Sequence, residues 1–323
     1  GKLVLYGGQG EGPKRLAETF EKTFGLTVER TDAVSGSIFA PKVLKERQAG
    51  VYTFDVAHMP TTTALTVMRP EGVWEPMKGV FFRPDVLDDK NWNGGFASGW
   101  LDKDKLLCYT PTLDASYSLF MNSDMVKDGE IKTIKDLADP KWKGKIMWTD
   151  VRVGHTFWPF TTVRLAHGDA ILKTLLVDQE PAFSRDFRQI AELMMRGRYA
   201  VTSGASRGFI KDQQNQGLAK NIKLLDIPDA SYQSGLAGST FLFNKAPHPN
   251  AAKLYMNWLL TKEGQAVFAK NIEANSRRVD VEPGDKELVP IAGRKYLIMD
   301  QEEMIPEIEK TQKIINDLVG IKN

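Results

Sequence analysis

The strongest constraint on the fold is a regular alternation of strand-like and helix-like segments in the first sixty residues. Strand-like segments occupy residues 3–6, 26–31 and 54–57, and two helix-like segments, 13–24 and 41–48, separate them. Gly25 ends the first helix-like segment, where a glycine is a common stop. The order strand-helix-strand-helix-strand predicts an α/β sheet, whose ligands bind at the carboxyl ends of the strands.

A similar alternation begins again in the middle of the chain. Its elements are a strand at 145–148, helices at 162–176 and 185–196, and a strand at 199–202. We therefore predict a second α/β lobe. Further helices are expected at 250–270 and 301–318, where apolar residues recur at helical spacing.

Two extended runs, 113–122 and 238–244, lie on either side of the second alternation. Two strand-like segments that join two lobes indicate a hinge. The predicted division is a discontinuous lobe 1, made of 1–112 and 243–323, and a lobe 2 made of 113–242.

Composition excludes several classes of partner and site. The 43 lysines and arginines nearly balance the 41 acidic residues, so the net charge of +2 gives no strong field for nucleic acid. No run of about 18 apolar residues is present to span a membrane. The single cysteine, Cys108, permits neither an internal disulfide nor a multi-thiolate metal site, and its apolar neighbours predict a buried, unreactive thiol.

The chain begins at Gly1 and enters a strand at once, without the features of an export signal. A mature chain whose signal peptide has been removed begins in this way, so composition alone leaves the location open.

The segment GASRG, residues 204–208, matches the G-x-S-x-G pattern of a hydrolase nucleophile elbow. Hydrolases of that type place the acid and the histidine after the serine in sequence, and His248, which lies between two prolines, is the only histidine after Ser206. A motif without its partners is a weak indication of catalysis, so we do not expect Ser206 to be a nucleophile.

The same segment has a second interpretation as an anion site. A strand that ends in serines and a glycine and leads into a helix presents free backbone N–H groups at a helix start. Residues 202–206 have this pattern, and Ser35-Gly36-Ser37 repeats it in the first lobe. The alternative is that these serines are ordinary helix caps.

Arg152, His155 and Thr156 follow the strand at 145–148, so they are expected near the carboxyl edge of the second sheet. An arginine there can bind a carboxylate or phosphate through two hydrogen bonds, although a surface ion pair with Asp150 is an equal alternative. His155 has no ligand-spaced partner beside it, which favours a neutral hydrogen-bonding role over metal binding.

Two further loops follow strands of the first lobe. Gly8 and Gln9 belong to a glycine-rich loop that lacks the spacing of a nucleotide-binding motif, so we interpret it as a cleft lining. His58 and Thr61 follow the third strand, where the threonines can cap a helix or face a ligand.

Three segments carry a resemblance to a known family. LADPKWKGKI (137–146), NKAPHPNAAK (244–253) and WLLTKEGQ (258–265) strongly resemble extracellular solute-binding proteins of ATP-binding-cassette (ABC) importers. The most similar subgroup includes ferric-ion binding proteins and relatives that bind phosphorylated or carboxylated organic solutes. The resemblance covers nearly the whole chain.

The resemblance implies a periplasmic-binding-protein fold of type II, in which two α/β lobes are joined by two hinge strands and close on a solute between them. It also implies export to the periplasm, or to the cell surface as a lipoprotein, and delivery of the solute to a membrane permease. We expect a monomer with no enzymatic activity, no cofactor and no nucleic-acid partner.

Mapped onto the resemblance, the ligand loops are 8–10, 35–37, 58–61, 150–156 and 202–207. The expected ligand-binding residues are Gly8, Gln9, Ser35, Gly36, Ser37, His58, Thr61, Arg152, His155, Thr156, Ser203, Gly204, Ser206 and Arg207.

One departure from the subgroup bears on the solute. Its ferric binders hold the ion largely through adjacent tyrosines, and this chain has no Tyr-Tyr pair. We therefore expect no metal and a small organic anion, such as a phosphonate, a phosphate ester or a carboxylate. The alternatives are a ferric ion, or a hydrolase that uses Ser206.

Overall fold

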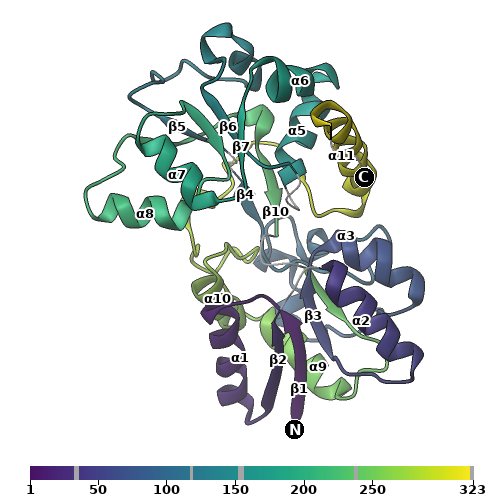
Figure 1. Ribbon diagram of the computed structural model, residues 1–323. Coiled ribbons are helices and arrows are strands. Elements are labelled where there is room, and N and C mark those ends of the chain that lie inside the picture. The colour runs from purple at the N-terminus through teal and green to yellow at the C-terminus, as the bar shows by residue number, and fades with distance from the viewer. Residues whose placement is uncertain (33–35, 117–118, 152–155, 236–238, 321–323) are drawn as a thin grey trace. The chain divides into compact units, whose positions relative to one another are not determined.

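The structure is a computed structural model that describes residues 1–32, 36–116, 119–151, 156–235 and 239–320 (Figure 1). Contacts between Cα atoms divide the chain into two compact units. Unit 1 comprises Gly1–Asp114, Gln233–Arg294 and Asp300–Ile305, and unit 2 comprises Ala115–Tyr232, Lys295–Met299 and Pro306–Asn323. Among the described helices, none has the length and apolar character needed to cross a membrane.

Unit 1 is built on a four-stranded sheet with the order β11-β3-β1-β2. Its strands are β1 (Lys2–Gly7), β2 (Thr27–Asp32), β3 (Val56–Met59) and β11 (Ser239–Leu242). Strand β1 is parallel to both β2 and β3, whereas β11 is antiparallel to β3. The carboxyl ends of β1, β2 and β3 therefore meet at one edge, as the sequence predicts.

Helices cover both faces of this sheet (Figure 1). One face carries α1 (Glu11–Phe24), α9 (Pro249–Leu259) and α10 (Lys262–Ile272), and the other carries α2 (Gly36–Gln48) and α3 (Thr61–Thr63). The short α4 (Pro84–Leu87) lies further along the chain. Leu3, Leu16, Phe20, Tyr255 and Phe268 form part of the core under α1, α9 and α10.

The single helix expected at 250–270 is wrong, because the structure divides it into α9 and α10. Thr261 begins the second helix: its hydroxyl oxygen accepts a hydrogen bond from the Gly264 backbone N–H at 3.0 Å. A β-carbon on Gly264 would lie 2.0 Å from the Trp258 carbonyl oxygen, so the sharp turn between the helices requires this glycine.

Unit 2 contains a five-stranded sheet with the order β7-β6-β8-β5-β9. Its strands are β5 (Leu119–Asn122), β6 (Ile146–Thr149), β7 (Ala182–Ser184), β8 (Val201–Ser203) and β9 (Ile222–Leu225). Strand β6 is parallel to β7 and β8, whereas β5 is antiparallel to β8 and β9. The second α/β sheet predicted from the sequence is thus present.

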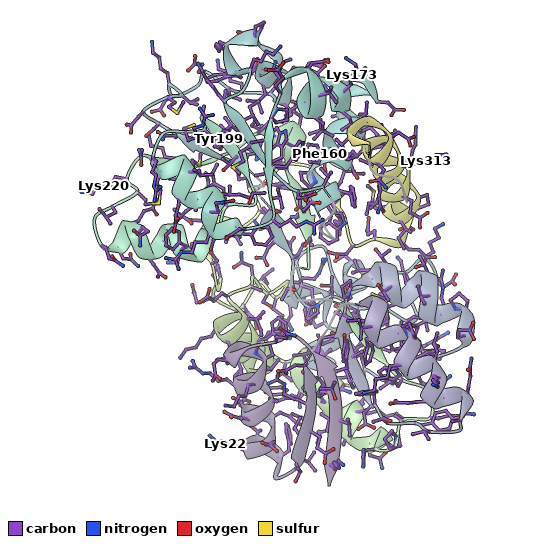
Figure 2. All side chains as sticks on the ribbon, in the orientation of Figure 1. Lys22, Phe160, Lys173, Tyr199, Lys220 and Lys313 are labelled. Carbon is purple, nitrogen blue, oxygen red and sulfur yellow. The ribbon has the colours of Figure 1, made fainter. Side chains whose placement is uncertain are left out.

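Helices α7 (Phe187–Met195) and α8 (Arg207–Asn215) pack on one face of this sheet, and α5 (Phe157–His167), α6 (Ala170–Lys173) and α11 (Ile305–Val319) lie on the other (Figure 1). Met147, Ile190, Met194 and Ile210 belong to the core under α7 and α8. Figure 2 shows Phe160 inside unit 2, whereas exposed lysines such as Lys173, Lys220 and Lys313 project outward.

The C-terminal helix differs from the predicted boundaries, which placed 243–323 in one lobe. Residues from Pro306 onward belong to unit 2. The reason is the buried Arg164 of α5, whose Nε donates to the Thr311 hydroxyl at 2.8 Å and whose guanidinium also pairs with Glu307. These bonds hold helix α11 against α5.

The chain crosses from unit 1 to unit 2, and later back to unit 1, inside two short strands. The unit boundaries fall in β4 (Asp114–Ser116) and β10 (Tyr232–Ser234), which form a three-stranded sheet with β12 (Leu297–Ile298) in the order β12-β10-β4. The second predicted connection, 238–244, instead contains β11, which pairs with β3 and is a sheet strand of unit 1. The passage occurs earlier, at Tyr232 and Gln233.

Candidate functional site

The carboxyl edge of the unit 1 sheet contains a pocket with a volume of about 430 Å³. Its lining comes from the ends of β1, β2 and β3, the start of α1 and the end of α10. The lining residues are Leu5, Gly7, Gly8, Gln9, Gly12, Pro13, Leu16, Arg30, His58, Tyr255, Phe268, Asn271, Ile272 and Glu273. This volume lies within the range of about 300 to 1,000 Å³ that is typical of small-molecule sites.

Three of the predicted ligand residues, Gly8, Gln9 and His58, lie together in this pocket. The glycine-rich loop allows the close approach, because a β-carbon on Gly7 would lie only 3.2 Å from that of His58. The strand-end prediction thus places these three residues in one cavity.

His58 forms the inner end of the pocket as a neutral ring. Its Nε2 lies 2.8 Å from the Tyr255 hydroxyl, and its Nδ1 lies 3.3 Å from the Thr240 hydroxyl. Burial lowers the pKa of His58 to about 4, so the imidazole carries no charge near neutral pH.

Tyr255 is also buried, and burial raises the pKa of its phenol well above the usual value, although nearby Arg30 opposes that shift. The phenol is therefore protonated and hydrogen-bonded to His58 at neutral pH.

Arg30 brings a positive charge to the pocket. Its Nη2 donates to the Gly8 carbonyl oxygen at 2.9 Å and to Asp32 Oδ1 at 2.6 Å. Its Nε and Nη1 donors have no partner among the described residues, and a guanidinium carries five N–H donors in all. Arg30 was not predicted from the sequence, because its place beside Leu5 depends on the register between β1 and β2, which only the structure shows.

Thr61 lies outside this pocket. Its side chain is buried, and its hydroxyl is 3.0 Å from that of Ser239 and 3.7 Å from the Cys108 sulfur. Burial raises the pKa of the Cys108 thiol well above its usual value, so the thiol is unreactive, as predicted.

In unit 2, the carboxyl ends of β6 and β8 lie at one edge and hold Ser203 and Gly204. The Ser203 hydroxyl accepts a hydrogen bond from the Thr149 backbone N–H at 3.1 Å, and the Thr149 hydroxyl donates to the Ser203 carbonyl oxygen at 3.1 Å. Gly204 has a positive φ of 69°, and a β-carbon there would lie 1.7 Å from the Thr149 hydroxyl oxygen. The turn after β8 is therefore accessible only to glycine.

Ser206 is the N-cap of α8. Its hydroxyl oxygen accepts a hydrogen bond from the Phe209 backbone N–H at 3.4 Å, and its own N–H donates to the Phe187 carbonyl oxygen at 2.8 Å. Arg207 begins α8, and the buried Thr156 precedes α5. Ser206 thus has the capping role that the sequence left as an alternative.

The described histidines do not serve Ser206 as a catalytic base. His58 is bonded to Tyr255, His167 lies 2.5 Å from Asp229, and His248 lies 3.0 Å from Asp55. None of these contacts joins a described histidine to the Ser206 hydroxyl, whose hydrogen-bond partner is the Phe209 backbone N–H, so the serine-base contact of a hydrolase is not formed among the described residues.

Some of the expected ligand residues cannot be placed. Ser35, Arg152 and His155 lie outside the described residues. Gly36 begins α2, followed by Ser37. The role of each expected ligand residue stays a prediction.

Comparison with known proteins gives a family and a fold. The sequence profile of the bacterial extracellular solute-binding proteins matches residues 15–275. A search of curated proteins found no match.

Solved structures with the same fold include several iron-related proteins. Iron-bound HitA from Pseudomonas aeruginosa is 16% identical with a TM-score of 0.68, and the alignment covers 98% of this chain and 99% of that one. The Trichodesmium protein IdiA (FutA), in complex with iron and citrate, is 17% identical with a TM-score of 0.73, covering 98% and 99%. The Bordetella ferric binding protein is 18% identical with a TM-score of 0.73 over 100% of both chains. This likeness establishes the two-lobed fold expected from the sequence.

Proposed function

The chain belongs to the family of bacterial extracellular solute-binding proteins, and we propose that it captures a small organic anion in the periplasm for an ABC importer. Members of this family bind solutes and deliver them to permeases, and they are not enzymes. Within this function, we propose that the solute belongs to one of three classes: a carboxylate, a phosphonate or a phosphate ester.

The observation that carries the proposal is Arg30 at the carboxyl edge of the unit 1 sheet. The Nε and Nη1 of Arg30 have no partner among the described residues, and a guanidinium favours a carboxylate or phosphonate oxygen over a cation, although the same pocket is also lined by one carboxylate, that of Glu273. The edge is also where α/β sheets commonly bind ligands.

A ferric ion is the second candidate. HitA, the Trichodesmium protein and the Bordetella protein are each described as binding iron or ferric ion, which supports this alternative. The local chemistry supports it less. Among the described residues, no group of three or more histidine, cysteine, aspartate or glutamate side chains is placed to hold a metal, and the sequence has no adjacent pair of tyrosines.

Titration calorimetry on ligand-free protein separates the two candidates. The probes are citrate, phenylphosphonate, leucine and Fe(III) supplied as its nitrilotriacetate complex. We expect saturable binding of at least one organic acid and a loss of about tenfold or more in its affinity on Arg30→Gln, the size of a lost charge-assisted hydrogen bond. Binding of Fe(III) without any organic acid would overturn the proposal in favour of the ferric alternative.

A further inference from the structure

Asn93 is the one asparagine of the sequence that a glycine follows. Asn93 and Gly94 are exposed in a turn of unit 1, where the Gly95 backbone N–H donates to the Trp92 carbonyl oxygen at 3.0 Å. Gly94 has a positive φ of 77°, and a β-carbon there would lie 3.1 Å from the Ser98 hydroxyl oxygen, so the turn favours a glycine at this position. Because glycine has no side chain, its backbone nitrogen is poorly shielded from the side chain of the asparagine before it.

The two asparagines that precede a serine are held by the fold. These are Asn122 and Asn275, and both side chains are buried. The side-chain amide of Asn122 donates to the Met194 carbonyl oxygen at 2.9 Å, and that of Asn275 donates to the Asp285 carbonyl oxygen at 2.9 Å. The side-chain amide of the exposed Asn93 has no hydrogen bond among the described residues, so the fold does not restrain it in this way.

Arg277 binds the peptide group that joins Asn93 to Gly94. Its Nη2 donates to the Asn93 carbonyl oxygen at 3.2 Å, and its own carbonyl oxygen accepts from the Asn93 backbone N–H at 2.8 Å. The residue is only 3% exposed. Burial lowers the pKa of Arg277, but an arginine starts so far above neutrality that the guanidinium stays charged at neutral pH.

No carboxylate forms an ion pair with Arg277 in the part of the chain that the structure describes. Its Nε and Nη1 are buried and have no hydrogen-bond partner there. The adjacent Arg278 differs, because Asp280 accepts from its Nε at 2.9 Å and from its Nη2 at 3.0 Å. The Asn93 carbonyl oxygen is therefore bound to a buried cation whose charge no acidic partner offsets.

The hydrogen bond from Arg277 acts on the acidity of the Gly94 N–H. The Asn93 carbonyl oxygen and the Gly94 nitrogen belong to one peptide group, so the negative charge left by loss of the proton is shared with that oxygen. A positively charged donor on the oxygen stabilises this deprotonated form. The Ser98 hydroxyl lies 3.0 Å from the same oxygen and 2.6 Å from the Gly95 carbonyl oxygen, and its single proton serves only one of them.

We propose that Asn93 is a site of spontaneous deamidation, promoted by the hydrogen bond from Arg277. The Gly94 nitrogen gives up its proton to solvent and attacks the side-chain carbon Cγ of Asn93. A bond forms between this nitrogen and Cγ, the bond from Cγ to Nδ2 breaks, and Nδ2 leaves as ammonia after taking up a proton from water. Water then opens the five-membered succinimide at either carbonyl, which gives aspartate or isoaspartate. The formal net charge of the chain falls by one, from +2 to +1.

Peptide mapping by mass spectrometry tests the proposal on the intact protein during incubation in mildly alkaline buffer. The fragment with Asn93 should gain the mass of an amide-to-acid conversion, whereas the fragments with Asn122 and Asn275 should not. The reference is a synthetic peptide of residues 88–99, which contains the same Asn-Gly pair without Arg277. We expect the native protein to react about tenfold faster than this peptide, which is the effect of one charge-assisted hydrogen bond. A native rate equal to or below that of the peptide would overturn the proposal.

Three variants assign the effect to its residues. Arg277→Met removes the charge and keeps an unbranched side chain in the buried position, so it should slow the reaction about tenfold. Arg83→Met, which removes an exposed arginine of unit 1, is the matched control and should leave the rate unchanged. Asn93→Gln should abolish the mass gain of its fragment.

Equal rates in the unsubstituted protein and in folded Arg277→Met would show that the arginine does not promote the reaction, and a mass gain that persists in Asn93→Gln would place it elsewhere. Either result contradicts the proposal. Circular dichroism confirms that each variant is folded. If Arg277→Met does not fold, the comparison of the native protein with the peptide decides the matter without it.

Discussion

Gly204 shows how a single residue fixes the end of a strand. Its left-handed backbone and the 1.7 Å approach of a hypothetical β-carbon to the Thr149 hydroxyl leave no room for a side chain. Beside this glycine, Thr149 of β6 donates two hydrogen bonds to Ser203 of β8, one from its backbone N–H and one from its hydroxyl, and these bonds link the two strands. The first glycine of the G-x-S-x-G pattern is thus required by the backbone of this turn, whether or not Ser206 has a catalytic role.

We predict that Gly204→Ala lowers the free energy of unfolding by about 2 kcal/mol or more, because it combines backbone strain with overpacking. The control is Gly208→Ala in α8, where nothing lies within 4 Å of the added methyl group and φ is not positive. That change should be neutral or stabilise by about 0.5–1 kcal/mol, since alanine favours a helix. Urea denaturation measures both, and equal effects of the two substitutions would contradict the prediction.

The stability of the protein depends on pH through His58, which lines the unit 1 pocket. The unfolded imidazole binds a proton below about pH 6.5, whereas the folded one does so only below about pH 4. The unfolded state therefore holds more protons between these values, and the free energy of unfolding falls as the pH is lowered from 6.5 toward 4.

We expect the contribution of His58 to this fall to be on the order of 3 kcal/mol, from the shift in its pKa. His58→Gln retains a hydrogen-bonding side chain but cannot titrate, so the difference in stability between pH 7 and pH 4.5 should shrink in the variant. The test is to measure the urea midpoint of unfolding at pH 7 and pH 4.5 for the unsubstituted protein and for His58→Gln. An unchanged difference would mean that His58 is protonated in the fold.

At the scale of elements, α11 illustrates a helix whose position depends on one buried side chain. Arg164 of α5 reaches Thr311 and Glu307 of α11, and also Asp169 at 3.3 Å. The carboxylates are partly exposed, so water can solvate them, but the guanidinium is only 4% exposed. The hydrogen bonds and ion pairs of Arg164 therefore determine where α11 attaches to α5. Apolar packing contributes the remaining stability of this contact.

Arg164→Met should destabilise unit 2 by about 2 kcal/mol, less than the loss of a fully buried ion pair, because Glu307 remains partly hydrated. Protease sensitivity of the α11 segment should rise in parallel. Arg188→Met, which removes an exposed i,i+4 pair on α7, is the matched control and should change stability by less than about 0.5 kcal/mol. Equal effects of the two variants would argue against the anchoring role.

Local sequence patterns predicted some elements well and others poorly. The helix at 13–24 ends in the structure where Gly25 predicted, because the stop signal is local. The helix at 250–270 was misjudged because its apolar pattern continues through the Thr261 cap. The short strands β7 and β9 were not predicted, since each is defined by pairing with a strand far away in sequence.

At the scale of the whole molecule, each unit has a large sheet and a hydrophobic core of its own, although the unit boundaries fall in the small β12-β10-β4 sheet. We therefore expect calorimetric unfolding to show two transitions instead of one. A ligand of the unit 1 pocket should raise only one of them, and Arg164→Met should lower the other. A single transition that moves as a whole in both experiments would show that the units unfold together.

The candidate site was predictable only in part. Gly8, Gln9 and His58 were expected because strand ends of an α/β sheet meet at one edge. Tyr255 and Glu273 were not, because they come from α9 and α10, more than 180 residues beyond His58 in sequence. No local pattern indicates that these helices pack beside α1.

The passage of the chain between the units also determines the order in which the fold can form. Strand β11 and helices α9 and α10 lie beyond residue 238, whereas residues 115–232 form the contiguous part of unit 2. A chain folding from its N-terminus can therefore pair most of the second sheet while β3 still exposes the edge that β11 will cover. Closing the first sheet requires a loop of some 180 residues, so we expect the unit 1 sheet to close more slowly than the unit 2 sheet, whose strands all lie between residues 119 and 225. An exported chain of this design benefits from remaining unfolded until it is complete.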